Sequence, residues 1–467
     1  MSECYCFIDF GSTFTKVCVI DIQDCRIVSR SQAPSTVNTD ITIGLEEALS
    51  RLTPPSIFKE CKVIRATSSA AGGLKMVAMG LVPDLTSEAA NRAALGAGAK
   101  VERVFSYRLT NREVREMIDI KPDIILLAGG TDGGNCETIV YNAKRIAQTN
   151  IVCPVVVSGN KEVVDEVEDI LIRGGQKVYV ADNVMPEIGK LAVESARENI
   201  REVFLEHIVH AKGLDKAKAL VDEIIMPTPM AVLNATTVLA EGTSQQRGVG
   251  DTMVVDVGGA TTDIHSVAWG TPIEPTVVLK GLPEPFAKRT VEGDLGIRIN
   301  APTIFHIANK SPSVSNLFAK YEAQWAERRA NYIATHINNI SQEQQEIKFD
   351  FDLSRAATAI ATNRHVGRIE TVYTISGAIQ VQIGKDLTRV RRVIGTGGIF
   401  AYGSDPAYIL KGTERQTIDH LLLKPEKPDF FIDSQYILFA AGLLSDLNKE
   451  ASLQIIKRYL QRLGPDQ

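Results

Sequence analysis

Two segments of this chain, about half its length apart, share one pattern. In each, an apolar strand ends in Asp-x-Gly and is followed by Thr-containing residues and a second β-rich run. The first is Ile8-Asp9-Phe10-Gly11-Ser12-Thr13-Phe14-Thr15-Lys16, and the second is Val254-Val255-Asp256-Val257-Gly258-Gly259-Ala260-Thr261-Thr262-Asp263-Ile264. β-rich runs on both sides of a glycine turn predict a hairpin at each place. The repeat therefore indicates two related halves, each with a strand pair that ends in a polar turn.

The chemistry of the first hairpin suits a phosphate. Gly11 allows a tight turn, so backbone N–H groups and the hydroxyls of Ser12 and Thr13 can face an anion. Asp9 can hold Mg²⁺ or its waters, and Lys16 can add charge to a bound phosphate. Taken alone, this segment is more readily explained as a plain hairpin with a turn Asp and Gly.

The second hairpin makes a phosphate site the better explanation of both segments. It again carries a strand-end carboxylate, glycines for close approach of the backbone, hydroxyls, and an acid that can position the turn or metal waters. These residues are Asp256, Gly258, Gly259, Thr261, Thr262 and Asp263. Two such hairpins predict a grip on one polyphosphate from opposite sides of a cleft.

A third segment, Val393–Phe400, has a strand that enters a Gly-Thr-Gly-Gly turn. Its residues are Gly395, Thr396, Gly397 and Gly398. Glycines there let a flat ring or a phosphate lie against bare backbone. The motif is weak by itself and gains its weight from its place after the two hairpins.

Length and composition limit the class of protein. A chain of 467 residues predicts at least two domains, and 23% charged with 44% hydrophobic residues excludes wholesale disorder. No apolar run approaches the ~20 residues of a membrane helix, and the start lacks a signal peptide, so we expect a cytoplasmic protein without a membrane partner. A net charge of −5, with mixed signs, argues against nucleic acid as the main partner. The seven scattered cysteines predict neither zinc nor an iron–sulfur cluster.

Strand and helix patterns alternate between the hairpins. Strands are predicted at 62–66, 123–128, 154–157 and 177–180, and helices at 195–225, 231–242, 350–364 and 436–445. The glycine-rich turn 128–134, with Thr131 and Asp132, is equally well explained as a second ligand-binding turn or as a turn bent for packing.

Hairpin Asp9–Lys16, hairpin Asp256–Asp263 and the turn Gly395–Gly398 resemble the phosphate-1, phosphate-2 and adenosine motifs of the actin, hexokinase and Hsp70-type ATPases. Helices 231–242 and 436–445 match the connecting helices of that superfamily. The resemblance implies an α/β, two-lobed fold with ribonuclease-H-like lobes and a central nucleotide cleft. The first lobe is expected at 1–245, with an α/β insertion at about 75–225, completed by 435–467; the second is expected at 246–434.

Within that superfamily, Leu126–Asn135 and Val291–Gly296 resemble the glutamate mutase accessory family, whose members are also called MutL or GlmL proteins and are distinct from the mismatch-repair MutL. The resemblance implies a chaperone-like ATPase that reactivates a coenzyme-B12-dependent mutase, with mutase subunits as partners and a homo-oligomer as one possible state. A small-molecule kinase, a nucleotide-controlled scaffold or filament, and a hydantoinase-like hydrolase remain as alternatives.

The resemblance also implies roles for residues. ATP or ADP would be bound with Mg²⁺, whose waters Asp9 and Asp256 would hold. Thr13 and Thr261 would contact phosphate or orient the attacking water, so Asp9, Asp256 and Thr261 are the catalytic candidates. The stretch 226–231 lacks the glutamate that assists water attack in the Hsp70 group, which leaves the catalytic base unassigned.

Overall fold

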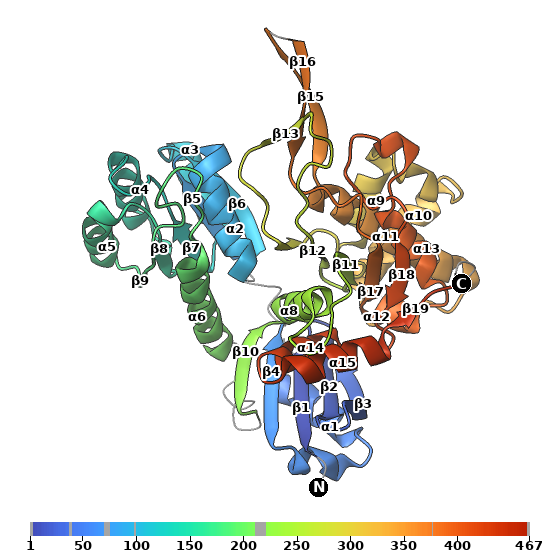
Figure 1. The fold of residues 1–467 in the computed structure, drawn as a ribbon. Helices are drawn as coiled ribbons and strands as arrows, with labels where there is room; N and C mark the ends of the chain where they lie inside the picture. The colour runs from blue at the N-terminus through green and yellow to red at the C-terminus, as the bar shows by residue number, and fades with distance from the viewer. Residues whose placement is uncertain are drawn as a thin grey trace. The chain divides into compact units, whose positions relative to one another are not determined.

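A computed structural model describes residues 3–36, 40–69, 75–97, 100–210, 221–375 and 377–464. The chain divides into two compact units (Figure 1). Unit 1 contains Met1–Gly72 and Lys216–Gln467, and unit 2 is Gly73–Asp215.

The first sheet of unit 1 has the strand order β10-β4-β1-β2-β3. Its strands are β1 (Cys4–Phe10), β2 (Phe14–Asp21), β3 (Arg26–Pro34), β4 (Val63–Ser68) and β10 (Glu223–Pro227). β1, β2 and β3 form an antiparallel meander, whereas β4 pairs in parallel with both β1 and β10. The predicted first hairpin is confirmed, with Asp9 directly opposite Lys16.

The second sheet repeats this plan. Its order is β14-β12-β11-β17-β18-β19. The strands are β11 (Thr252–Val257), β12 (Thr262–Val267), β14 (Ala287–Glu292), β17 (Arg392–Thr396), β18 (Asp429–Ile432) and β19 (Gln461–Arg462). Again an antiparallel meander is extended by two parallel strands, and the short β19 adds an antiparallel edge beside β18. The shared topology confirms the two related halves and the α/β, two-lobed actin/Hsp70-type fold with ribonuclease-H-like lobes.

Two helices that are apolar on nearly all sides lie in the middle of unit 1 (Figure 1). They are α8 (Thr228–Glu241) and α14 (Leu438–Ser445), which pack closely on each other, and both were predicted from sequence. A helix is apolar all round when it is buried on all sides. Among the residues that the structure describes, the other α-helices of unit 1 are α1 (Ile41–Ser50), α9 (Ala301–Lys310), α10 (Ala323–Thr335), α11 (Gln344–His365), α12 (Gly398–Tyr402), α13 (Pro406–Leu410) and α15 (Lys449–Tyr459).

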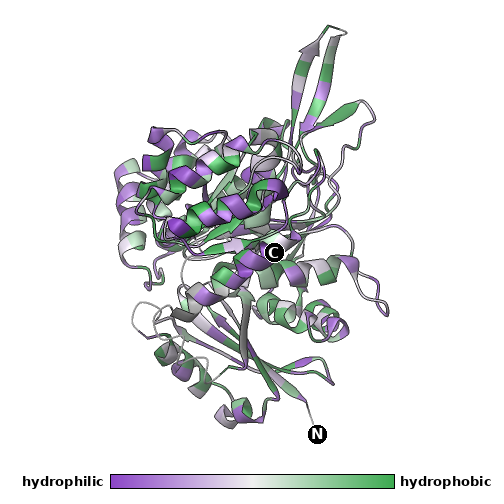
Figure 2. Cartoon of the chain, turned by 90° about the vertical axis from the view of Figure 1, so that its left-hand side faces the viewer, coloured by the Kyte–Doolittle hydropathy of each residue, from purple (hydrophilic) through white to green (hydrophobic). Residues whose placement is uncertain are grey.

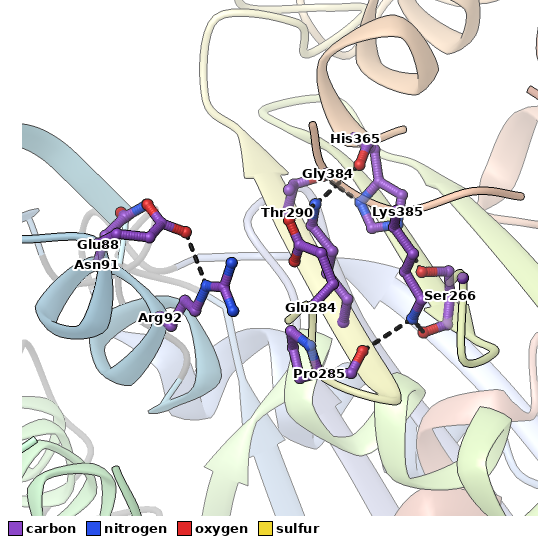
Figure 3. A network of polar contacts seen from close by, with 12 residues as sticks. Glu88, Asn91, Arg92, Ser266, Glu284, Pro285, Thr290, His365, Gly384 and Lys385 are labelled. Carbon is purple, nitrogen blue, oxygen red and sulfur yellow. Dashed lines mark hydrogen bonds and ion pairs between the residues drawn. The ribbon is translucent and has the colours of Figure 1, made fainter. Parts of the chain in front are cut away.

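A small third sheet projects from unit 1 as an arm (Figure 1). It consists of β13 (Val277–Lys280), β15 (Arg368–Thr374) and β16 (Gly377–Ile383). Buried polar contacts fix its base to β12 and to the residue before β14. Lys385 donates to the carbonyls of Ser266 and Phe286, and the His365 ring bonds the Ser266 hydroxyl at 2.7 Å. Figure 3 shows Lys385 beside Ser266.

Unit 2 is built on a parallel sheet with the order β6-β5-β7-β8-β9. Its strands are β5 (Lys75–Gly80), β6 (Lys100–Ser106), β7 (Ile124–Leu127), β8 (Val155–Val157) and β9 (Val178–Val180). Its helices are α2 (Glu88–Ala97), α3 (Asn111–Ile120), α4 (Glu137–Ala147), α5 (Val164–Arg173) and α6 (Glu194–His210). α3, α4 and α5 supply one apolar core of the unit, and α2 packs on α6.

The strands predicted around 62–66, 123–128, 154–157 and 177–180 are confirmed. The helix predicted at 195–225 is wrong at its end, because α6 ends at His210 and Glu223–Pro227 forms β10; residues 211–220 lie outside the described residues. The segment around Met226 pairs with β4, and that tertiary contact outweighs the local helical pattern. Figure 2 colours the chain by hydropathy: many helices carry both hydrophilic and hydrophobic residues, whereas hydrophobic residues are frequent in the strands. In the described part of the chain, every helix is too short or too polar to cross a bilayer.

Candidate functional site

The two hairpin turns have the same backbone geometry. In the first, Gly11 N–H donates to the Phe14 carbonyl at 3.1 Å; in the second, Gly258 N–H donates to the Thr261 carbonyl at 2.9 Å. Asp9 therefore corresponds to Asp256. The residue opposite differs, because Lys16 faces Asp9 whereas Asp263 faces Asp256. The first hairpin thus pairs opposite charges and the second pairs like charges.

A cavity of about 680 Å³ in unit 1 brings these turns together. This volume lies in the range of small-molecule sites. Most of the residues predicted for the site line it: Asp9, Gly11, Ser12, Thr13, Lys16, Asp256, Gly258, Gly259, Thr261, Asp263, Gly397 and Gly398. The three motifs, which are widely separated in sequence, meet at one cavity.

The turns come close together at two glycines. A Cβ at Gly259 would lie 2.9 Å from Cγ2 of Thr13, so the two hairpin turns nearly touch. A Cβ at Gly397, where φ is +111°, would lie 2.4 Å from the Val257 carbonyl oxygen. The glycine turn therefore lies directly against the second hairpin.

Asp9 is buried and fully engaged by neighbouring groups. Its Oδ2 accepts from Lys16 Nζ at 2.9 Å, and its Oδ1 accepts from the hydroxyls of Thr228 at 2.6 Å and Thr67 at 3.3 Å. The Lys16 ammonium also lies 3.8 Å from the centre of the Tyr436 ring. Asp9, held by these hydroxyls, keeps Lys16 at the cavity wall. Burial disfavours the charged form of Lys16, but the Asp9 carboxylate outweighs that effect and raises the pKa of Lys16.

The second hairpin places two acids, Asp256 and Asp263, directly opposite each other. Burial and the neighbouring Asp9 and Asp433 carboxylates raise the pKa of Asp256 to about 6, although Lys16 opposes the shift. Burial and Asp256 raise the pKa of Asp263 to about 8. Oδ1 of Asp263 is buried without a hydrogen-bond partner among the described residues. A cation beside Asp256 and Asp263 would offset both the cost of burying their charges and the repulsion between them.

The donor set fits Mg²⁺ bound through water and phosphate. Within the described residues, no three His, Cys, Asp or Glu side chains lie close enough to hold a metal alone. Mg²⁺ commonly keeps several waters and takes one or two carboxylates together with substrate phosphates. Asp256 and Asp263, with the unpartnered Oδ1, are the groups that suit it.

The segment Val291–Gly296 and the residues that follow it hold the second turn in place. Ile297 and Arg298 N–H groups donate to the carbonyls of Gly258 and Gly259 at 3.1 and 3.0 Å. Asn300 Nδ2 donates to the Ala260 carbonyl at 3.1 Å, and a Cβ at Gly296 would lie 2.1 Å from the Ala260 carbonyl carbon. This motif, noted from sequence only as a resemblance, is a brace for the second hairpin.

Three of the predicted residues have other contacts. Thr262 Oγ1 donates to the Leu295 carbonyl at 2.7 Å, and Thr396 Oγ1 donates to Asp433 at 3.1 Å. A Cβ at Gly395 would lie 2.6 Å from the Phe400 ring. These residues support the cavity wall from behind rather than lining it.

Several lining residues were not predicted, because only tertiary packing brings them to the cavity. Arg298, Asp350, Tyr402 and Tyr436 belong to this group. Asp433 lies behind the wall, where it accepts the N–H groups of Ile437 and Leu438 at the start of α14. Asp433 lies four residues before Ile437, the N-cap of α14, so the usual capping pattern would not have identified it.

The glycine-rich turn after β7 lies in unit 2 and is held by internal hydrogen bonds. Asp132 Oδ1 accepts from Asn183 Nδ2 at 2.9 Å and from the Lys161 N–H at 3.2 Å. Gly129, Gly130 and Gly133 all have positive φ. These contacts favour a turn bent for packing, and a ligand there stays a prediction.

Comparison with known proteins gives the family. Residues 5–460 match the sequence family described as MutL protein. The chain belongs to the MutL family. Protein MutL of Clostridium tetanomorphum is 47% identical over 463 residues, which are 99% of this chain and 100% of that protein. This MutL family member therefore matches its relative along nearly the whole length of both chains.

The solved structures that the chain matches are much less similar to it in sequence. Glycerol dehydratase reactivase is 11% identical, with a TM-score of 0.33, over 95% of this chain and 99% of its own. Gluconate kinase from Lactobacillus acidophilus is 10% identical, with a TM-score of 0.35, over 99% and 93%. A short-chain flavodoxin is 18% identical, with a TM-score of 0.22, over 29% of this chain and 98% of its own.

Proposed function

We propose that this protein binds and hydrolyses ATP as an accessory, reactivating protein for a coenzyme-B12-dependent mutase such as glutamate mutase. The observation that supports nucleotide binding is the meeting of two equivalent hairpin turns and a glycine turn at one cavity of about 680 Å³. Membership of the MutL family supports the mutase as client.

In the proposed complex, N–H groups of the two turns other than those of Gly11 and Gly258, and the hydroxyls of Ser12, Thr13 and Thr261, contact the phosphates. Lys16, held by Asp9, adds positive charge on the side of the first hairpin. Mg²⁺ would neutralise phosphate charge, with Asp256 and Asp263 holding its waters. The sequence predicted Asp9 for this role together with Asp256; in this proposal Asp9 holds Lys16 instead, because both of its oxygens already accept from Lys16, Thr67 and Thr228. The glycines Gly397 and Gly398 face the adenosine.

Catalysis in this arrangement comes from position and charge. The second hairpin fixes Thr261 and Asp256 beside the terminal phosphate, where they orient an attacking water. With a pKa of about 6, Asp256 is mostly ionised at neutral pH even without a cation, and a bound cation would lower its pKa further.

Calorimetric titration with ATP and Mg²⁺, followed by a phosphate-release assay, tests the proposal. We expect binding and slow hydrolysis by the parent protein, and loss of hydrolysis by roughly 100-fold or more in Asp256→Asn, because that change removes a group that acts on the transition state. Asp9→Asn should lose hydrolysis as well, since Lys16 is then no longer held. Asp352→Asn, a buried acid on α11 outside the cavity, is the matched control. Parental hydrolysis rates in both site variants would contradict the assignment.

A further inference from the structure

The arm of unit 1 presents a strand edge without charge. β15 is the outer strand of the sheet β13-β16-β15, and from Thr371 to Ile383 the sequence contains no Asp, Glu, Lys, Arg or His. Tyr373 on this edge is 84% exposed. Figure 1 shows β15 and β16 projecting beyond the other elements of unit 1. Open edges bind other strands through their unpaired backbone groups, and proteins commonly protect them with charged residues or proline. An uncharged, projecting edge therefore indicates a binding surface.

The open part of this edge is short and has defined ends. At its base, the Ile369 N–H donates to the Leu421 carbonyl at 2.9 Å, so that position is already paired. At its tip, β15 ends at Thr374. Among the residues that the structure describes, no segment outside the arm pairs with the backbone between these two points. The stretch Glu370–Thr374 is therefore the part of the edge that another strand can reach.

The tip of the arm has few neighbours in its own sheet. β13 pairs with residues 380–383 of β16, so in the described part of the chain Gly377–Ile379 has β15 as its one neighbouring strand. A two-stranded hairpin is marginally stable in water, whereas three or more strands can hold together. A strand added to the open edge of β15 would supply the pairing that the tip lacks.

The direction of the backbone groups determines how a second strand can pair with β15. Along an antiparallel strand, the residues alternate between those that bond one neighbour and those that face the other side. The Ile369 N–H points away from β16, toward Leu421, so the N–H and C=O groups of Thr371 and Tyr373 also point outward. Two copies of β15 that run antiparallel about Val372 place Thr371 of each copy opposite Tyr373 of the other. The outward groups of both residues are then paired in both copies.

The side chains agree with this pairing. On one face of the sheet each Tyr373 lies beside a Thr371, and an aromatic residue opposite a β-branched one stabilises antiparallel strands. On the other face the Val372 side chains meet on the twofold axis, and each Glu370 meets a Thr374, so no like charges are opposed. The open stretch is therefore complementary to itself, which favours a second copy over an unrelated strand.

We propose that two copies of this chain bind each other through β15, in an antiparallel pairing centred on Val372 that joins the two three-stranded arms into one sheet. Such an interface is isologous, because the same strand is used by both copies. A pairing of this length buries much less than the ~1,600 Å² of a standard stable interface, so the dimer is weak and depends on concentration. The proposal is independent of the nucleotide cavity.

Sedimentation velocity of the full chain over a range of concentrations tests the pairing. We expect the parent to shift from monomer to dimer as its concentration rises. Thr371→Pro removes an outward N–H and places a ring on the edge, while the bonds to β16 remain, since proline is tolerated where the N–H faces away from the sheet. This variant should dimerise roughly tenfold or more weakly, because the twofold axis doubles the loss.

A charge exchange tests the register. Val372→Lys and Val372→Glu each bring two like charges together on the axis, so each variant alone should dimerise roughly tenfold or more weakly than the parent. An equimolar mixture of the two should recover the dimer, because opposite charges then meet. The recovery also shows that both variants are folded.

Val278→Lys is the matched control, because Val278 is 55% exposed on β13, at the opposite edge of the same arm. It should dimerise like the parent. A parent that stays monomeric throughout the range would overturn the proposal, and so would a dimer that Thr371→Pro leaves intact. A mixture that fails to recover the dimer would overturn the register. If the β15 variants instead abolish a complex with the mutase while the parent is monomeric, the edge binds the client and the self-pairing is wrong.

Discussion

At the scale of single residues, the second hairpin gives the clearest pH dependence. The pKa of Asp263 is raised to about 8 by burial and by Asp256, against an ordinary value of 3.8. Between these values the folded protein binds a proton that the unfolded chain has lost. The free energy of unfolding therefore falls as pH rises through this range, by at most about 1.4 kcal/mol per pH unit from this group.

Asp263→Asn should remove that dependence. Relative to the parent, we expect the variant to become progressively more stable as the pH is raised from about 5 to about 8, and to gain little more above that. Urea unfolding in the absence of nucleotide and metal measures the difference. A stability difference that stays flat with pH, or that shrinks as pH rises, would show that Asp263 is ionised in the folded protein.

Cation binding should show the opposite trend, because a cation competes with these protons. Ionised Asp256 and Asp263 favour Mg²⁺, so the Mg²⁺-dependent part of nucleotide affinity should increase with pH up to about 8. Titration of ATP with Mg²⁺ and with EDTA, at several pH values, isolates this part. Asp263→Asn should show a shallower rise, and an unchanged slope in the variant would place the cation elsewhere.

Sequence patterns identified most of these residues because the chemistry is local. Asp9 and Asp256 each end an apolar strand beside a glycine, and that spacing survives in the fold. The pattern did not reveal that Thr262 faces the Leu295 carbonyl or that Gly395 packs on Phe400. Side-chain direction in a strand depends on the register, which the motif alone does not give.

At the scale of elements, the crossing of α8 and α14 controls how the lobes are joined. A Cβ at Gly442 of α14 would lie 1.8 Å from the Ala231 carbonyl oxygen of α8, so the helices must separate to accept any side chain. We expect Gly442→Ala to destabilise unit 1 by about 1–3 kcal/mol, as overpacking does. Both helices begin at the site, where Thr228 contacts Asp9, so nucleotide affinity should fall too.

Thermal unfolding and ATP titration check this expectation. Gly398→Ala is the control for unfolding, because Gly398 is helical, has no positive φ, and has open space where the Cβ would stand. Its unfolding temperature should stay at or slightly above that of the parent. An equally stable Gly442→Ala protein would mean that the crossing adjusts without cost.

Elements were predictable where a long, uniform pattern decided them. α8, α14 and the two hairpins belong to this group. The edge strand β10 was taken for the end of a helix, because its pairing with β4 depends on residues far away in the sequence. For the same reason, the sequence could not predict that α11 forms one wall of the cavity. A helix was predicted at 350–364, but only packing places Asp350 near Gly259 and Arg298.

At the scale of the whole molecule, the proposed function requires that nucleotide and client affect each other. Nucleotide can change the affinity for a mutase only through different affinities for the free and complexed protein. The effect is therefore reciprocal, and the mutase must shift the affinity for ATP or ADP by the same factor, typically about 5–150-fold in coupled systems. Measuring both directions separates true coupling from independent binding at two surfaces.

We expect a B12-dependent mutase, or its cobalamin-binding subunit, to form a complex whose stability differs between ATP and ADP. An inactivated mutase incubated with this protein, Mg-ATP and fresh cobalamin should regain activity, and Asp256→Asn should not support the recovery. A size-exclusion column run with each nucleotide detects the complex. Asp352→Asn, which keeps the cavity intact, controls for general loss of function. Equal recovery with and without ATP, together with a complex whose stability is the same with ATP and ADP, would contradict the mutase as client. That result would leave the proposed ATP site standing, because phosphate release by the parent and by Asp256→Asn tests the site separately.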